Sequence, residues 1–66
     1  MYVVVFKELG QQVNVWSGYH SIAEARSDVR ESDMCIPMTW DYEIVSEETL
    51  LNRYEEEYYK EKENVA

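Results

Sequence analysis

The sequence is poor in the residues from which catalytic, metal-binding and phosphate-binding motifs are built. It has one cysteine, Cys35, and one histidine, His20, among 66 residues. A zinc site needs three or four ligands at productive spacing, and a cysteine nucleophile needs a base beside it. The two glycines, at positions 10 and 18, do not form a glycine-rich phosphate loop. We therefore predict that the chain is not an enzyme and binds no metal or cofactor.

The chain also lacks long apolar runs and a second cysteine for a disulfide. Its longest apolar, strand-favouring run covers residues 2–6, whereas a membrane-spanning helix needs about 20 apolar residues. The N-terminus has no basic stretch followed by a longer apolar segment, so no signal peptide is expected. An unpaired thiol fits a reducing compartment. These features predict a soluble, cytoplasmic protein.

Positive charge is scarce and negative charge is unevenly placed. Six Lys and Arg stand against 14 Asp and Glu, which gives a net charge of −8. Residues 1–40 hold five acids and three bases, whereas residues 41–66 hold nine acids and three bases. Such a chain will not bind bare nucleic acid, because phosphate contacts need an excess of Lys and Arg. The acidity either serves solubility or favours a basic partner surface.

The length predicts a single domain, residues 1–66, organised around a central strand. A chain of this size buries only about 60% of the surface that its unfolded form exposes. The run Tyr2–Phe6 is apolar at every position, which is typical of a strand covered on both faces. This strand is therefore the expected centre of the sheet.

Turn and capping signals divide the rest of the chain. The segment 8–12 predicts a hairpin loop in which Gly10 takes a positive φ. Ser21 and Glu24 form a capping box before a helix, and Ser46 caps a second helix whose first turn holds Glu47 and Glu48. The predicted strands cover residues 2–7, 13–17 and 39–45, and the predicted helices cover residues 22–32 and 47 onwards.

This order predicts an α+β fold of the type β-β-α-β-α. A right-handed crossover over the first strand gives a three-stranded antiparallel sheet of order 2-1-3. Both helices are expected mainly on one face of the sheet. The other face, which carries Val3, Val5, Val13 and Val15, is too apolar for ordinary surface and is expected to contact a second copy or a partner. In the alternative arrangement the last helix covers that face.

The connector between the first helix and the third strand is apolar and contains Pro37. One interpretation is that Ile36 and one methionine close the bottom of the core. The other is that Met34 and Met38 are exposed in a loop, residues 34–38, that contacts a partner, since Met adapts well to such surfaces.

The candidate partner-binding residues combine carboxylates with one tyrosine. Acids that flank an exposed aromatic ring suit a surface that meets arginines, because carboxylates pair with guanidinium groups and the ring stacks on them. These residues are Asp41, Glu43, Glu47, Glu48, Glu55, Glu56, Tyr59 and Glu63.

Two functions fit these features. In the first, the acids imitate phosphates, and the chain is an inhibitor that occupies the basic nucleic-acid-binding surface of a nuclease, CRISPR effector, repair enzyme or polymerase. In size and charge the chain resembles the small acidic proteins that phages direct against such host enzymes. In the second, it is an interaction or homodimerisation module that uses the apolar sheet face or the loop 34–38. We prefer the first because nine acids are concentrated in the last 26 residues.

Overall fold

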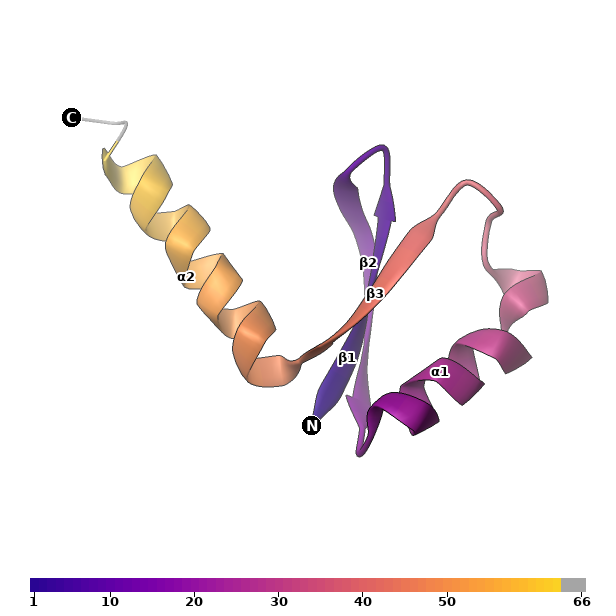
Figure 1. Cartoon of the computed structure of the whole chain (residues 1–66). Helices are drawn as coiled ribbons and strands as arrows, with labels where there is room; N and C mark the ends of the chain where they lie inside the picture. Colours follow the sequence, from indigo (N-terminus) through magenta and orange to yellow (C-terminus); the bar gives the residue numbers. More distant parts are fainter. Residues whose placement is uncertain (64–66) are drawn as a thin grey trace.

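The fold is a three-stranded antiparallel sheet with two α-helices, in the order β-β-α-β-α (Figure 1). The computed structural model describes the backbone of residues 1–63 and the side chains of residues 1–60. β1 is central and pairs with both other strands, which gives the order β2-β1-β3. The predicted fold class and strand order are thus confirmed. The elements are β1 (Tyr2–Glu8), β2 (Gln11–Tyr19), α1 (Ile22–Glu31), a short 3-10 turn (Asp33–Cys35), β3 (Asp41–Ser46) and α2 (Glu47–Glu63).

The β1–β2 hairpin closes through a turn of two residues. Leu9 and Gly10 have φ angles of 51° and 78°, so both central residues lie in the left-handed region, as a type I′ turn requires. β2 is longer than the predicted 13–17, because its pairing with β1 continues through two irregularities and does not stop at either of them. One irregularity falls opposite Phe6 and Lys7, and the other lies beside Gly18, whose φ is 92°.

α1 begins at the predicted capping box. The Ser21 hydroxyl accepts a hydrogen bond from the Glu24 backbone N–H at 3.0 Å. The Glu24 carboxylate accepts from the backbone N–H of His20 at 2.8 Å, one residue earlier than a standard box would place it. Ala25 and Val29 are the buried residues of this helix.

The helices are divided between the two faces of the sheet, which corrects the expectation that both pack mainly on one face. Ala25 and Val29 of α1 pack with Val4 and Phe6, and Trp16, Trp40 and Ile44 surround them. Leu50 of α2 packs with Val3 and Val5 on the opposite face. The physical reason is that β1 is apolar on both faces, so each face needs cover. The alternative arrangement, with the last helix over the second face, is the observed one.

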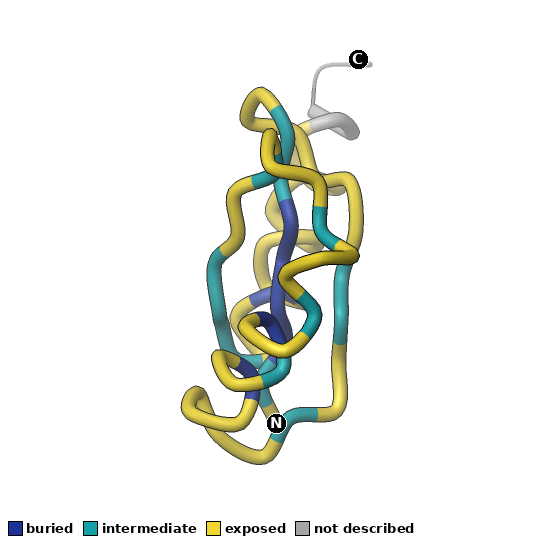
Figure 2. Tube along the Cα trace, turned by 90° about the vertical axis from the view of Figure 1, so that its right-hand side faces the viewer, coloured by how far each residue is buried: buried dark blue, intermediate teal, exposed yellow. Residues whose placement is uncertain are grey.

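β1 is therefore the most buried segment of the molecule, and the dark blue trace in Figure 2 follows it between two more exposed strands. Phe6 anchors the α1 side, with its ring 4.6 Å from the ring of Trp16 in an edge-on contact. On the other side, Leu50 is the only buried residue of α2 among those described. After Leu50 the helix diverges from the sheet (Figure 1), and Leu51, Tyr54 and Tyr58 are exposed.

Candidate functional site

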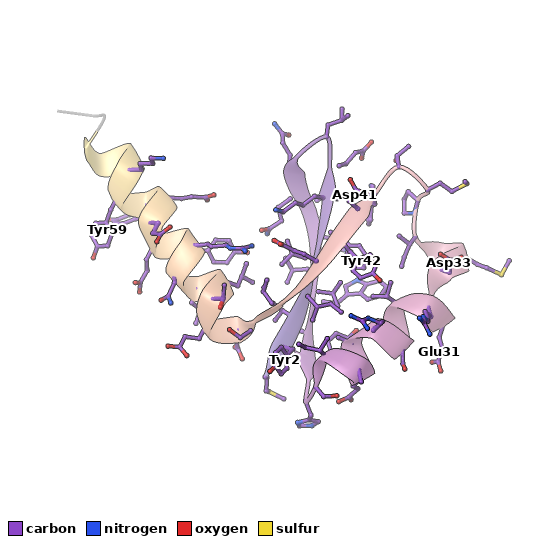
Figure 3. All side chains as sticks on the ribbon, viewed as in Figure 1. Tyr2, Glu31, Asp33, Asp41, Tyr42 and Tyr59 are labelled. Carbon is purple, nitrogen blue, oxygen red and sulfur yellow. The ribbon has the colours of Figure 1, made fainter. Side chains whose placement is uncertain are left out.

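The predicted acidic site falls into two groups, one on β3 and one on α2. Asp41 and Glu43 lie on β3, opposite Lys7 and Val5 of β1. The remaining residues lie on α2, where Glu47 and Glu48 form the first turn. Figure 3 shows Tyr59 on the side of α2 away from the sheet and Asp41 on the sheet itself. The side chain of Glu63 lies outside the described residues.

Glu43 is matched by positive charge within the molecule. Its carboxylate accepts a hydrogen bond from Arg53 of α2 and lies 3.2 Å from the Lys7 ammonium of β1. The hydrogen bond from Arg53 lowers the pKa of Glu43; partial burial opposes this effect, and Lys7 reinforces it. Glu43 therefore connects α2 to the sheet, a role that its position in the sequence did not indicate.

A second polar contact joins α2 to the tip of the hairpin. The Gln12 side-chain amide donates a hydrogen bond to the Tyr54 hydroxyl at 2.9 Å. Gln12 and Tyr54, together with Leu50 and Arg53, line a gap of about 140 Å³ that Lys7 and Glu57 also border. Ligand pockets are usually about 300–1,000 Å³, so this gap is too small to hold a typical ligand.

The outward side of α2 presents acids that are not matched in this way. Glu48 and Glu55 are seven residues apart and Tyr59 follows four residues later, so all three lie on one side of the helix, with about 10 Å between the two glutamate positions along its axis. Glu48, Glu55 and Glu56 are exposed. Within residues 1–60 the salt bridges involve Glu43 and none of these three. The Tyr59 ring, 62% exposed, contacts the Tyr58 ring edge-on.

The connector after α1 forms a second feature, which the sequence indicated only in part. Ile36 packs against the core as expected, but neither methionine does, since the side chains of Met34 and Met38 are both fully exposed. A shallow hollow of about 380 Å³ lies beside this loop, lined by Val29, Asp33, Ile36, Pro37, Met38, Trp40 and Tyr42. The prediction that one methionine closes the core is therefore wrong, since both methionines are exposed; contact of this loop with a partner stays a prediction.

The other titratable contacts are structural. The Tyr19 hydroxyl donates to the Asp28 carboxylate and so joins β2 to α1. Burial, together with this hydrogen bond and the nearby negative charges of Asp28 and Glu24, raises the pKa of Tyr19 to about 12. Among the described residues, no three His, Cys, Asp or Glu side chains come close enough together to hold a metal ion. In the same part of the chain, no helix has the length and apolar character needed to cross a membrane.

Comparison of the chain with models of protein families, with characterised proteins and with solved structures finds no match. The geometry of the two acidic groups and of the hollow is therefore the basis for the functional proposal.

Proposed function

We propose that this chain is a small non-enzymatic inhibitor that binds the basic nucleic-acid-binding surface of another protein. The target class is a nuclease, CRISPR effector, repair enzyme or polymerase, and the setting is a bacterial cytoplasm in which a phage-type inhibitor acts. The observation that carries the proposal is the outward side of α2. Glu48, Glu55 and Glu56 are exposed there near Tyr59, and within residues 1–60 no salt bridge includes any of the three.

Two physical effects support binding to a cationic surface. A net charge of −8 on 66 residues attracts a basic partner over long range and raises the rate of encounter. At contact, Glu48 and Glu55 are placed to pair with Lys or Arg, and the Tyr59 ring offers a face on which a guanidinium group stacks. Glu43 contributes less to this surface, because Arg53 and Lys7 already match its charge.

The test is a capture experiment at two salt concentrations. The tagged chain is incubated with bacterial lysate at about 50 mM and about 500 mM salt, since screening weakens exposed charge pairs. We expect a basic nucleic-acid-binding protein to be retained at low salt, released at high salt and displaced by duplex DNA. Retention that survives high salt and excess DNA contradicts the proposal.

A matched pair of variants assigns the binding surface. Glu48→Gln combined with Glu55→Gln changes the net charge by +2, and Glu31→Lys changes it by the same amount on the exposed end of α1. We expect the α2 variant to lose capture at least about tenfold, which corresponds to about 1.4 kcal/mol, while Glu31→Lys retains most of it. Equal loss in both variants would show that only net charge matters.

One observation favours a second candidate function, an apolar interaction module. Met34 and Met38 are exposed at 100% and 103% of the reference side-chain area, and exposed methionines are common on adaptable binding surfaces. Binding of this kind survives high salt and is lost on Met34→Ser combined with Met38→Ser. A homodimer through the sheet face is less favourable than the sequence suggested, because Leu50 covers Val3 and Val5.

A further inference from the structure

The two edge strands of the sheet differ in how open they are to an added strand. Edge strands carry unpaired backbone N–H and C=O groups, and proteins often block them with bulges or polar side chains. β2 is blocked in both ways. Its pairing with β1 is irregular at two places, and the Asn14 side-chain oxygen accepts a hydrogen bond from the Val15 backbone N–H at 2.9 Å.

β3 has no bulge and, among the described residues, no side-chain hydrogen bond to its own backbone of the kind that Asn14 makes on β2. It pairs with β1 without a register shift from Asp41, opposite Lys7, to Ser46, opposite Tyr2. Figure 1 shows β3 as the front strand, and within residues 1–63 neither helix crosses its outer edge. A regular, uncovered edge of six residues is long enough to template another strand, because strands are typically about 5–6 residues long.

The two faces beside this edge differ chemically. On the α1 face, Tyr42 is 45% exposed and borders the hollow of about 380 Å³ that Ile36 and Met38 also line. On the α2 face, Asp41 is exposed and Glu43 is next along the strand on the same side. Glu43 is matched by Arg53 and Lys7, whereas no ion pair within residues 1–60 includes Asp41. Because side chains of an added strand alternate between the two faces, such a strand would place every second residue against apolar groups and one of the others against the Asp41 carboxylate.

A second copy of this chain does not fit this edge. In a symmetric antiparallel pair of β3 strands, the Asp41 carboxylates of the two copies would lie on the same face of the joined sheet. Like charges at such cross-strand positions are destabilising, and each copy carries a net charge of −8. The occupant that complements the edge is instead a strand that alternates apolar with basic residues.

We propose that β3 accepts an extended segment of a partner protein as a fourth strand, and that this segment alternates apolar residues, which face Tyr42 and the hollow, with basic residues, one of which faces Asp41. Glu43 is not counted in this charge match, because Arg53 and Lys7 already pair with it. Backbone hydrogen bonds to the edge supply affinity, and the alternating side chains supply specificity. The inference rests on the proposed function only for the basic character of the partner. It uses a surface separate from the outward side of α2.

The test uses a synthetic peptide of about seven residues that alternates Val and Lys, a length matched to the edge. Binding is followed through the backbone amide signals of the isotope-labelled chain in NMR titrations. We expect the largest shifts at Tyr42 and Ile44 on β3 and little change at Val15 on β2. An otherwise equal peptide that alternates Val and Glu should bind at least about tenfold more weakly, because its charges repel the Asp41 carboxylate and the net charge of −8 on the chain.

Two variants separate this edge from the outward side of α2. Asp41→Lys, at an exposed position, should weaken binding of the Val/Lys peptide at least about fivefold, because the substitution reverses the charge that faces the peptide's lysines. The double variant Glu48→Gln, Glu55→Gln should leave peptide binding unchanged. Shifts confined to α2 or β2, no binding of the Val/Lys peptide, or equal binding of the Val/Glu peptide overturns the inference. The lysate capture that tests the proposed function is scored independently of these results.

Discussion

At the scale of single residues, Leu9 occupies a conformation that suits few side chains. Its φ is 51° in the hairpin turn and its side chain is 97% exposed, so no packing offsets the strain. Non-glycine residues in the left-handed region cost about 1 kcal/mol or more, and Asn is the best tolerated of them. Leu9→Asn should therefore raise the free energy of unfolding by about 0.5–1 kcal/mol, measured by urea denaturation.

The neighbouring glycine provides the control for the Leu9 prediction. Gly10 has a φ of 78°, and no atom lies within 4 Å of the position that a Cβ would take. Gly10→Ala should therefore destabilise the hairpin by about 1 kcal/mol through backbone strain alone. If Leu9→Asn instead destabilises the chain, the turn in solution is not of type I′.

The lowered pKa of Glu43 makes one contact dependent on pH. Because the pKa of folded Glu43 lies below its ordinary value of 4.5, ionised Glu43 stabilises the fold above that pH, and the effect is lost as the pH falls through the lowered folded value. Glu43→Gln should therefore cost stability at pH 7, by less than about 1 kcal/mol for so exposed a pair. The difference in stability between wild type and variant should shrink at a pH well below 4.5.

Urea denaturation at both pH values measures this difference. Glu48→Gln is the matched control, because Glu48 is exposed and none of the ion pairs within residues 1–60 includes it. A gap between wild type and Glu43→Gln that is equally large at both pH values would show that the charge of Glu43 does not stabilise the fold.

Local signals at single residues were readable from the sequence, whereas contacts between distant residues were not. Ser21 and Ser46 cap their helices as predicted, because the bonded backbone N–H lies three residues away in each case. The link from Arg53 to Glu43 depends on where α2 crosses β3, and neither hydrophobic period nor propensity specifies that crossing.

At the scale of elements, α2 depends on one buried side chain. Leu50 is 7% exposed and Leu51 is 55% exposed, although the two are adjacent and chemically identical. Leu50→Ala should lower the free energy of unfolding by about 2–3 kcal/mol, because it uncovers Val3 and Val5. Leu51→Ala, the matched control, should cost less than about 0.5 kcal/mol. Equal effects in thermal denaturation would show that α2 packs on the sheet differently.

α1 is joined to β2 by Tyr19, which gives this side of the sheet an alkaline pH dependence. The pKa of Tyr19 is raised from 10.0 to about 12, so the neutral hydroxyl stabilises the fold fully below pH 10 and progressively less as the pH rises toward 12. Tyr19→Phe should lower the free energy of unfolding by about 1 kcal/mol at pH 7. The difference in this free energy between variant and wild type should become smaller above pH 10. Urea denaturation at pH 7 and near pH 11 tests this, and a constant difference would contradict it.

The order of the strands could be predicted from the sequence, whereas the sheet face that α2 covers could not. The two-sided apolar run of β1 required a central strand, which fixed the order β2-β1-β3. The apolar positions of α2, residues 50, 51, 54 and 58, predict a helix with an apolar side but do not say which sheet face it covers. That choice follows from the direct passage of β3 into α2, since Ser46 ends the strand and caps the helix.

At the scale of the whole molecule, the surface is larger than a compact chain of this mass requires. The accessible area is 5396 Å², against about 4,400 Å² expected for 7.9 kDa. The divergence of α2 contributes to this excess, because it leaves Leu51, Tyr54 and Tyr58 exposed. An apolar surface of this kind promotes self-association unless another force opposes it.

The opposing force is the net charge, so association should depend on pH. At pH 7 each copy carries a charge of −8, and mutual repulsion should keep the chain monomeric. Near its isoelectric point of about 4.4 the repulsion vanishes, while the lowered pKa of Glu43 keeps that residue more ionised than an ordinary glutamate at the same pH. We expect sedimentation velocity to show monomers at pH 7 and larger species near pH 4.5.

Leu51→Ser should reduce the association near pH 4.5 without altering the charge, since it removes an exposed apolar side chain from α2. If the chain is equally monomeric at both pH values, the exposed apolar side chains of α2 (Leu51, Tyr54 and Tyr58) form a surface that is too small or too polar to self-associate. If it is already dimeric at pH 7, charge repulsion does not control its assembly, and a second copy becomes the first partner to consider for the apolar surface.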